Sequence, residues 1–168
     1  MYVSYSTSSK LSQNWTIAEL TKTNCGLNNV PSLEHILNLH YGVVMILQPL
    51  RDYCGCPLIC NSAYRSAEVN KAVCGVPSSQ HLSGCAADIR IPENKKIEIW
   101  NFLTKCKYVD QAPGGHSFVH ISWSPCRQPR QYYKLNYYNY SNEQETFLDK
   151  SHQGFALGFL RKFEETEE

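Results

Sequence analysis

A histidine and an aspartate lie seven residues apart in the segment Ser79–Asp88, with one glycine and two alanines between them. Asp88 opens a short apolar run, which predicts that it projects from a strand. A second histidine, His120, lies inside Phe118–Trp123, where bulky and small residues alternate as they do in strands. Two histidines and one aspartate supply three protein ligands, the number that a catalytic zinc site uses. The sequence therefore predicts a metal centre formed by His81, Asp88 and His120.

The complete pattern is Ser-x-His-x-x-Gly-x-Ala-x-Asp, followed at a distance by Val-His. It resembles the zinc D-alanyl-D-alanine peptidases, a family that includes VanY-like carboxypeptidases and phage endolysins. The resemblance extends to the Tyr-Arg-Ser segment at Tyr64–Ser66, and residues 11–135 resemble one subfamily A peptidase domain. The resemblance implies the hedgehog/DD-peptidase fold and a Zn²⁺ ion held by His81, Asp88 and His120.

The hydrophobic pattern itself predicts an α+β domain, with a small antiparallel sheet packed against helices. The longest predicted helix starts after Pro31 with Ser32 as its N-cap, because apolar residues from Ile36 to Leu50 recur at three- and four-residue steps. Predicted strands at residues 109–111 and 118–123 flank a Gly-Gly turn and are expected to pair as antiparallel neighbours. Strands interrupted by helices, with mostly antiparallel neighbours, are typical of the α+β class. Further helices are predicted over residues 15–20, 66–73 and 93–105, and further strands over 57–62, 86–91 and 131–135.

The length of 168 residues suits a single domain with one core. We predict that residues 1–135 form this domain. After Leu135 the composition becomes rich in tyrosine and asparagine, and apolar residues return only near the end. Residues 136–168 are therefore predicted to be a C-terminal extension, either a helix laid on the domain or a tail. The sequence leaves the oligomeric state open.

The charge and hydropathy of the sequence limit which partners and which cellular location can be expected. The formal net charge of +1 indicates no general attraction to nucleic acid or to an anionic membrane. No run of 18 apolar residues occurs, so no membrane span is predicted. Residues 1–13 are polar and lack the apolar core of a signal peptide. We therefore expect synthesis in the cytoplasm and action at the bacterial cell wall only after release.

Eight cysteines are spread along the chain without a Cys-x-x-Cys pair, which disfavours a closed structural zinc cluster. Cys60 and Cys85 lie among apolar residues, where a free thiol packs as a small hydrophobe. Buried free thiols are the favoured interpretation, since cytoplasmic synthesis keeps thiols reduced. Some disulfides and a second metal site are the alternatives.

The resemblance implies hydrolysis of D-Ala-containing bonds in the stem peptides of peptidoglycan, by a carboxypeptidase or an endopeptidase. A zinc ion would make hydroxide available at neutral pH and polarise the peptide carbonyl. Arg65 is implied as a catalytic and substrate-binding residue, because the arginine fork binds a carboxylate through two hydrogen bonds. A surface salt bridge is the alternative for Arg65. Ser79 matches the motif serine that helps to seat substrate, and a turn-forming hydroxyl is its alternative.

The catalytic base is the point at which this chain departs from the family, which usually places a glutamate shortly before the last histidine ligand. Residues 110–117 contain no glutamate. His116 is one candidate, because a neutral imidazole near a metal can carry protons. Asp110 is the second candidate and also a candidate substrate contact. A chain without a base would be a weak enzyme, so the alternative function is a pseudo-enzyme that binds cell-wall peptide or a protein partner.

Overall fold

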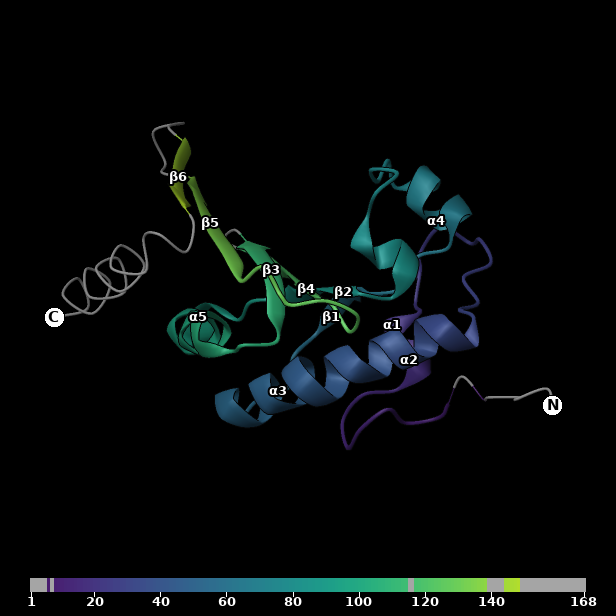
Figure 1. Cartoon of the computed structure of the whole chain (residues 1–168), viewed down its shortest axis with the longest axis horizontal. Coiled ribbons are helices and arrows are strands. Elements are labelled where there is room, and N and C mark those ends of the chain that lie inside the picture. Colours follow the sequence, from purple (N-terminus) through teal and green to yellow (C-terminus); the bar gives the residue numbers. More distant parts are fainter. Residues whose placement is uncertain (1–5, 7, 115–116, 139–143, 149–168) are drawn as a thin grey trace, which may run out of the picture.

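The computed structural model describes residue 6 and residues 8–114, 117–138 and 144–148 (Figure 1). The helical elements are α1 (Ile17–Leu20), α2 (Leu33–Gly42), the π-helical η1 (Val43–Leu47), α3 (Gln48–Cys54), α4 (Ala67–Ala72), the 3₁₀ segments η2 (Gln80–Ser83) and η3 (Glu93–Lys95), and α5 (Lys96–Lys105). The strands are β1 (Cys60–Ser62), β2 (Ala86–Arg90), β3 (Val109–Gly114), β4 (Phe118–Trp123), β5 (Tyr132–Tyr138) and β6 (Gln144–Leu148).

These strands form one sheet in the order β1-β2-β4-β3-β5-β6. The predicted α+β class is confirmed, and β3 and β4 pair antiparallel as expected. One pair differs from a fully antiparallel sheet, because β5 runs parallel to β3. The loop formed by residues 124–131 carries the chain from β4 past β3, so that β5 runs opposite to β4 and therefore in the direction of β3.

Residues 33–54 form a continuous helical segment that crosses one face of the sheet (Figure 1). Its start is as predicted: the Ser32 hydroxyl accepts a hydrogen bond from the His35 amide, and the His35 ring accepts one from the Ser32 amide. Trp123 of β4 packs so closely on Gly42 that any side chain at position 42 would overlap the indole ring. The segment also supplies much of the fully buried core, through Leu39, Val43, Ile46, Leu47 and Leu50.

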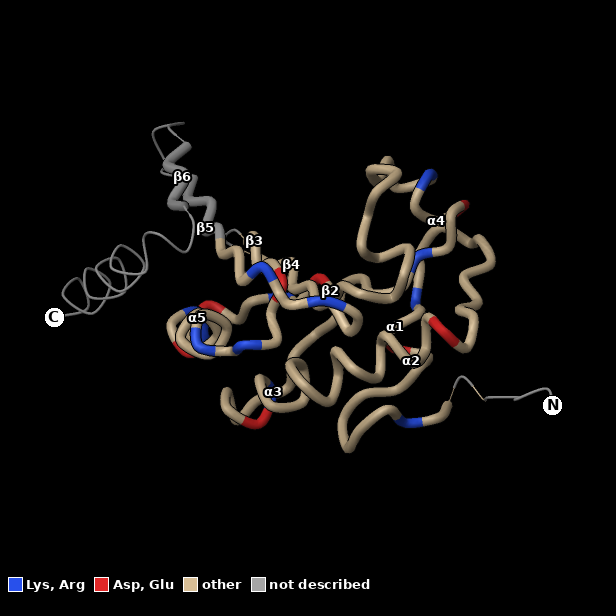
Figure 2. Tube along the Cα trace, viewed as in Figure 1, with Lys and Arg blue, Asp and Glu red and all other residues tan. Residues whose placement is uncertain are grey.

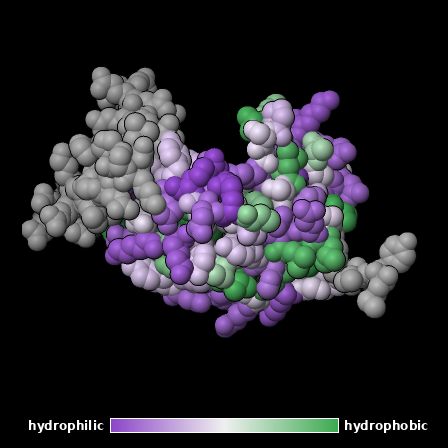
Figure 3. Space-filling model, in the orientation of Figure 1, coloured by the Kyte–Doolittle hydropathy of each residue, from purple (hydrophilic) through white to green (hydrophobic). Residues whose placement is uncertain are grey.

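The two faces of the sheet have different environments, because successive residues of a strand point to opposite sides. Ile89, Val119 and Ile121 are fully buried in the core that includes the long helical segment. Asp88 and His120 alternate with these residues and therefore project from the other face. In Figure 3 the described surface is hollowed between the part that carries α4 and the strands. The polar residues of β2 and β4 thus belong to the hollowed side of the molecule.

All eight cysteines are free thiols in the structure. Cys54 is buried in the core, where burial raises the pKa of its thiol to about 11. Four more pack half-buried against the core, namely Cys56, Cys60, Cys85 and Cys106. Most of the cysteines therefore pack as small hydrophobes, in agreement with the interpretation favoured from the sequence.

Parts of the predicted C-terminal extension belong to the sheet. Residues 136–138 complete β5, and residues 144–148 form β6 against it. The remainder of 136–168 lies outside the described residues. Basic and acidic residues are interspersed along the described trace (Figure 2). Among the described residues, no helix has both the length and the apolar character needed to cross a bilayer.

Candidate metal centre

Three side chains from three separate elements converge on the hollowed side of the sheet. Asp88 on β2 and His120 on β4 stand directly opposite each other in the antiparallel register, and His81 reaches them from η2. The Oδ1 atom of Asp88 lies 2.9 Å from His120 Nδ1 and 3.3 Å from His81 Nε2. The two histidine nitrogens are 3.2 Å apart. The structure thus brings together the three residues predicted as ligands.

The spacing of these three atoms fits a small cation held between them. Zinc bonds of about 2.0–2.2 Å at tetrahedral angles separate neighbouring ligand atoms by roughly 3.3–3.5 Å. The observed separations of 2.9 to 3.3 Å are close to this range. With neutral imidazoles, three lone pairs would face one another and repel, whereas a divalent cation would satisfy all three. The donor set of two imidazoles and one carboxylate is one that zinc accepts, and it leaves a fourth position for solvent.

The contacts of His81 determine which of its ring nitrogens faces the space between the three ligand atoms. Its Nδ1 atom lies 2.5 Å from the carbonyl oxygen of Ala63. A carbonyl can only accept a hydrogen bond, so Nδ1 carries the proton and Nε2 presents its lone pair towards Asp88 and His120. His81 is also buried, with 3% of its surface exposed. A backbone carbonyl that fixes the tautomer in this way is the usual outer partner of a metal-binding histidine.

Glycine is required between His81 and Asp88 for a local reason. Gly84 ends η2 with a φ of +69°, in the left-handed region that side chains disfavour. A Cβ atom at this position would also lie 2.6 Å from the backbone carbonyl oxygen of His35 on α2. Gly84 therefore lets the chain turn tightly against α2 and enter β2, which sets the distance between the two functional side chains.

Arg65 contacts the cluster through Asp88. Its Nη2 atom donates to Asp88 Oδ2 at 2.8 Å, and its Nε atom donates to the Ser62 hydroxyl at 2.8 Å. Burial alone would raise the pKa of Asp88, but the close contacts of its carboxylate with the rings of His120 and His81 hold that pKa well below its usual value. Asp88 therefore carries its negative charge, with Oδ1 turned to the histidines and Oδ2 turned to Arg65. A role of Arg65 in substrate binding stays a prediction. What the structure shows is that Arg65 binds the carboxylate of Asp88.

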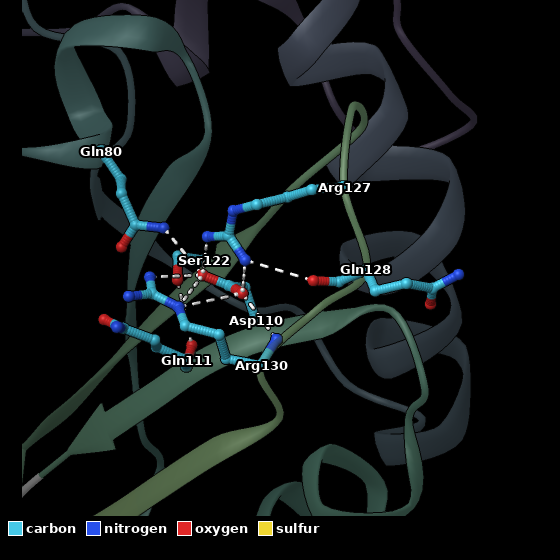
Figure 4. Close-up of polar contacts among 7 residues, drawn as sticks. All are labelled: Gln80, Asp110, Gln111, Ser122, Arg127, Gln128 and Arg130. Carbon is cyan, nitrogen blue, oxygen red and sulfur yellow. Dashed lines mark hydrogen bonds and ion pairs between the residues drawn. The ribbon is translucent and has the colours of Figure 1, made fainter.

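Asp110, the other acidic candidate, lies at the centre of a separate polar cluster (Figure 4). Its side chain is fully buried, and its two oxygens accept hydrogen bonds from both Arg127 and Arg130 at 2.6 to 3.2 Å. The Arg130 amide and the Gln80 side chain also donate to it. Burial would raise its pKa, yet the bonds from Arg127 and Arg130 hold that pKa well below its usual value. A carboxylate covered in this way is poorly placed to take a proton or to touch substrate itself, so its contacts favour an indirect role.

The lowered pKa of Asp110 predicts a contribution to stability that depends on pH. Because the folded protein binds the proton more weakly than the unfolded chain, the contribution is present above the ordinary pKa of about 3.9 and is lost as pH falls through the folded value. Asp110→Asn should lower the free energy of unfolding at pH 7 by about 1–2 kcal/mol, since the half-exposed arginines regain hydration. In urea titrations this deficit should shrink between pH 4 and pH 2. The control Asp52→Asn removes an exposed carboxylate on α3, and a deficit independent of pH would contradict the assignment.

The roles predicted for Ser79 and His116 also stay predictions. Ser79 is half-buried and immediately precedes η2, the segment that carries His81, and its hydroxyl makes no capping hydrogen bond to the described part of that segment. This position is compatible with a substrate contact beside the metal centre. His116, the favoured candidate for the base, lies outside the described residues.

Sequence reasoning missed several residues that hold the site. Asn29 is largely buried and donates to the carbonyls of Thr21 and Tyr64, while its own oxygen accepts from the Ser66 amide. Asn29 thereby fixes the segment that carries Arg65. Arg127 and Arg130 were also missed, although two arginines in a short loop with two prolines would have been a usable signal.

An α+β domain with two histidines and an aspartate converging on the open side of its sheet has the architecture of a metal-dependent hydrolase. The family model described as Peptidase M15 matches residues 11–122, which are 112 of the 168 residues and include all three converging side chains. The chain therefore belongs to the Peptidase M15 family, whose members are generally zinc-dependent peptidases. The match is to the family as a whole and does not assign a subfamily. No curated protein matched the chain.

Proposed function

We propose that this chain is a zinc metallopeptidase of the VanY-like, subfamily A type that hydrolyses D-Ala-containing peptide bonds in peptidoglycan stem peptides. The observation that carries the proposal is the convergence of His81, Asp88 and His120 within the region that matches the peptidase family. Their atoms are close enough to bind one ion, and they come from rigid elements of the sheet and η2. Either a carboxypeptidase or an endopeptidase is compatible with this geometry.

The residues of the site would divide the work as follows. When bound by the three ligands, zinc lowers the pKa of a coordinated water and polarises the substrate carbonyl. Ala63 keeps His81 in the correct tautomer through its carbonyl oxygen, and Arg65 holds the ligand carboxylate of Asp88. Arg65 and Ser79 are the proposed substrate contacts, and His116 is the proposed proton acceptor.

One observation favours a second candidate function, a pseudo-enzyme that binds cell-wall peptide or a protein partner. Of the two candidates for the base, Asp110 is fully buried and its oxygens are engaged by arginines. If His116 does not take the proton either, the site would retain its metal ligands without a general base. Such a domain would bind metal and peptide with little turnover.

A turnover assay on a defined peptide distinguishes the two functions. The zinc-loaded protein is incubated with a stem pentapeptide that ends in D-Ala-D-Ala and, separately, with cross-linked peptidoglycan fragments. Release of free D-alanine is expected from a carboxypeptidase, and new free amines without D-alanine are expected from an endopeptidase. Activity should disappear with a chelator and return on addition of zinc. Peptide binding without any product, measured by calorimetry, would support the second function instead.

A further inference from the structure

The polar cluster at Asp110 carries more positive charge than the buried carboxylate needs. One carboxylate is neutralised by one guanidinium, yet both Arg127 and Arg130 bind it, and the Arg130 amide adds another hydrogen bond. Asp110 is fully buried, whereas the side chains of Arg127 and Arg130 are 47% and 51% exposed. The cluster therefore presents a net positive charge at the surface, with its arginines held in place from below.

The arginines also retain donors that can reach a ligand. Arg127 uses Nη1 and Nη2 on Asp110, and Nη1 also donates to the Gln128 carbonyl. Among the contacts of the described residues, the Nε–H of Arg127 has no acceptor. With its amide oxygen turned towards Arg130, Gln111 accepts from both terminal nitrogens of that guanidinium at 2.8 and 3.0 Å. Figure 4 shows both guanidinium groups gathered over Asp110, with Gln80 reaching in from η2.

Two connections place this cluster beside the metal centre. Gln80, whose side chain donates to Asp110 at 3.2 Å, directly precedes His81 in η2. On β4, Ser122 follows His120 by two residues and packs against Gln111 through a hydrogen bond of 3.4 Å to its carbonyl. Residues two apart on a strand project from the same face about 7 Å apart, which is close to the length of two residues of an extended peptide. A peptide bound at the metal centre would thus place a group one or two residues from the cut bond near the arginines.

We propose that Arg127 and Arg130 form a carboxylate clamp that selects substrates with a free carboxylate next to the scissile bond. The planar guanidinium fork binds carboxylates through paired hydrogen bonds, and Asp110 orients both forks in advance. This proposal rests on the proposed peptidase function and names its substrate class. The carboxylate has two possible sources, the C-terminus of the peptide and an acidic side chain beside the cut bond.

Binding to a peptide that cannot be cleaved tests the clamp independently of turnover. The zinc-loaded protein is titrated by calorimetry with a D-Ala-D-Ala peptide whose scissile amide is N-methylated. One arm compares the free C-terminal acid with the C-terminal amide, and a second arm compares Glu with Gln immediately before the cut bond. The variants are Arg127→Gln and Arg130→Gln, and the control is Arg51→Gln on α3.

Each clamp variant should weaken binding of the carboxylate-bearing peptide about tenfold and leave the amide form unchanged. Arg127→Lys, which keeps the charge without the fork, should restore part of the loss. The arm that loses its discrimination identifies the source of the carboxylate.

Equal binding of acid and amide forms by the wild type in both arms would overturn the clamp, whatever the hydrolytic activity. Acid-dependent binding of this peptide, together with no product from the cleavable peptides of the turnover assay, would instead contradict the peptidase function and leave the clamp standing. Thermal unfolding and zinc content of each variant show whether a loss reflects the fold.

Discussion

Replacement of His81 by alanine should lower kcat/KM for D-alanine release by at least about 1,000-fold, because two ligands cannot hold the ion at neutral pH in competition with water. The same variant should purify with much less zinc than the wild type. The residual cluster would consist of Asp88 and His120, which are 2.9 Å apart and retain their strand pairing. Measurement of kcat/KM alongside metal content by mass spectrometry checks both expectations.

Two further variants keep this test interpretable. His81 is buried, so its loss could also disturb the fold, whereas the side chain of His120 is 21% exposed and its replacement by alanine is less disruptive. His81→Ala and His120→Ala should show the same loss of activity and of bound zinc. His40→Ala removes an exposed histidine on α2, which packs on the other face of the sheet, and should retain full activity. Wild-type rates in the His81 or His120 variant would mean that the metal centre has been placed wrongly.

Part of the convergence of the three ligands could be predicted from local features. The motif fixes a short path from His81 through Gly84 into β2, and alternation within each strand decides which face a side chain takes. Strand pairing then sets Asp88 opposite His120. The first two steps follow from residues near one another in the sequence, whereas Asp88 and His120 are 32 residues apart, and their convergence was implied by the resemblance of the whole motif to the peptidase family.

The parts that could not be predicted depend on long-range packing. The burial of Asp110 results from a loop that follows β4 and has no hydrophobic periodicity, and its two arginines are 17 and 20 residues away in the chain. The parallel pairing of β5 with β3 depends on the path of this same loop. The π-helical turn at Val43–Leu47 was missed because it hardly disturbs an apolar stripe at three- and four-residue steps.

Arg65→Ala should weaken zinc binding by about 10- to 100-fold, the range typical for loss of an outer partner of a metal ligand. Arg65 bridges Ser62 on β1 and the Oδ2 atom of Asp88, and this bridge aims Oδ1 at the two histidines. Without the bridge, the carboxylate is free to rotate away from the ligand position. Competition with a chromophoric chelator measures the zinc affinity, and Arg51→Ala on α3 serves as the control.

The lysine variant separates the positioning role of Arg65 from a direct contact with substrate. Lysine keeps the positive charge but cannot bridge the Ser62 hydroxyl and the Asp88 carboxylate with one planar group, so Arg65→Lys should recover only part of the zinc affinity. If Arg65 acted on substrate alone, both variants would bind zinc like the wild type and show only a raised KM or a lowered kcat. Because the bridge is formed within the protein, we expect the loss of zinc affinity to be measurable without any peptide present. Any additional rise in KM at saturating zinc would then report the contact with substrate.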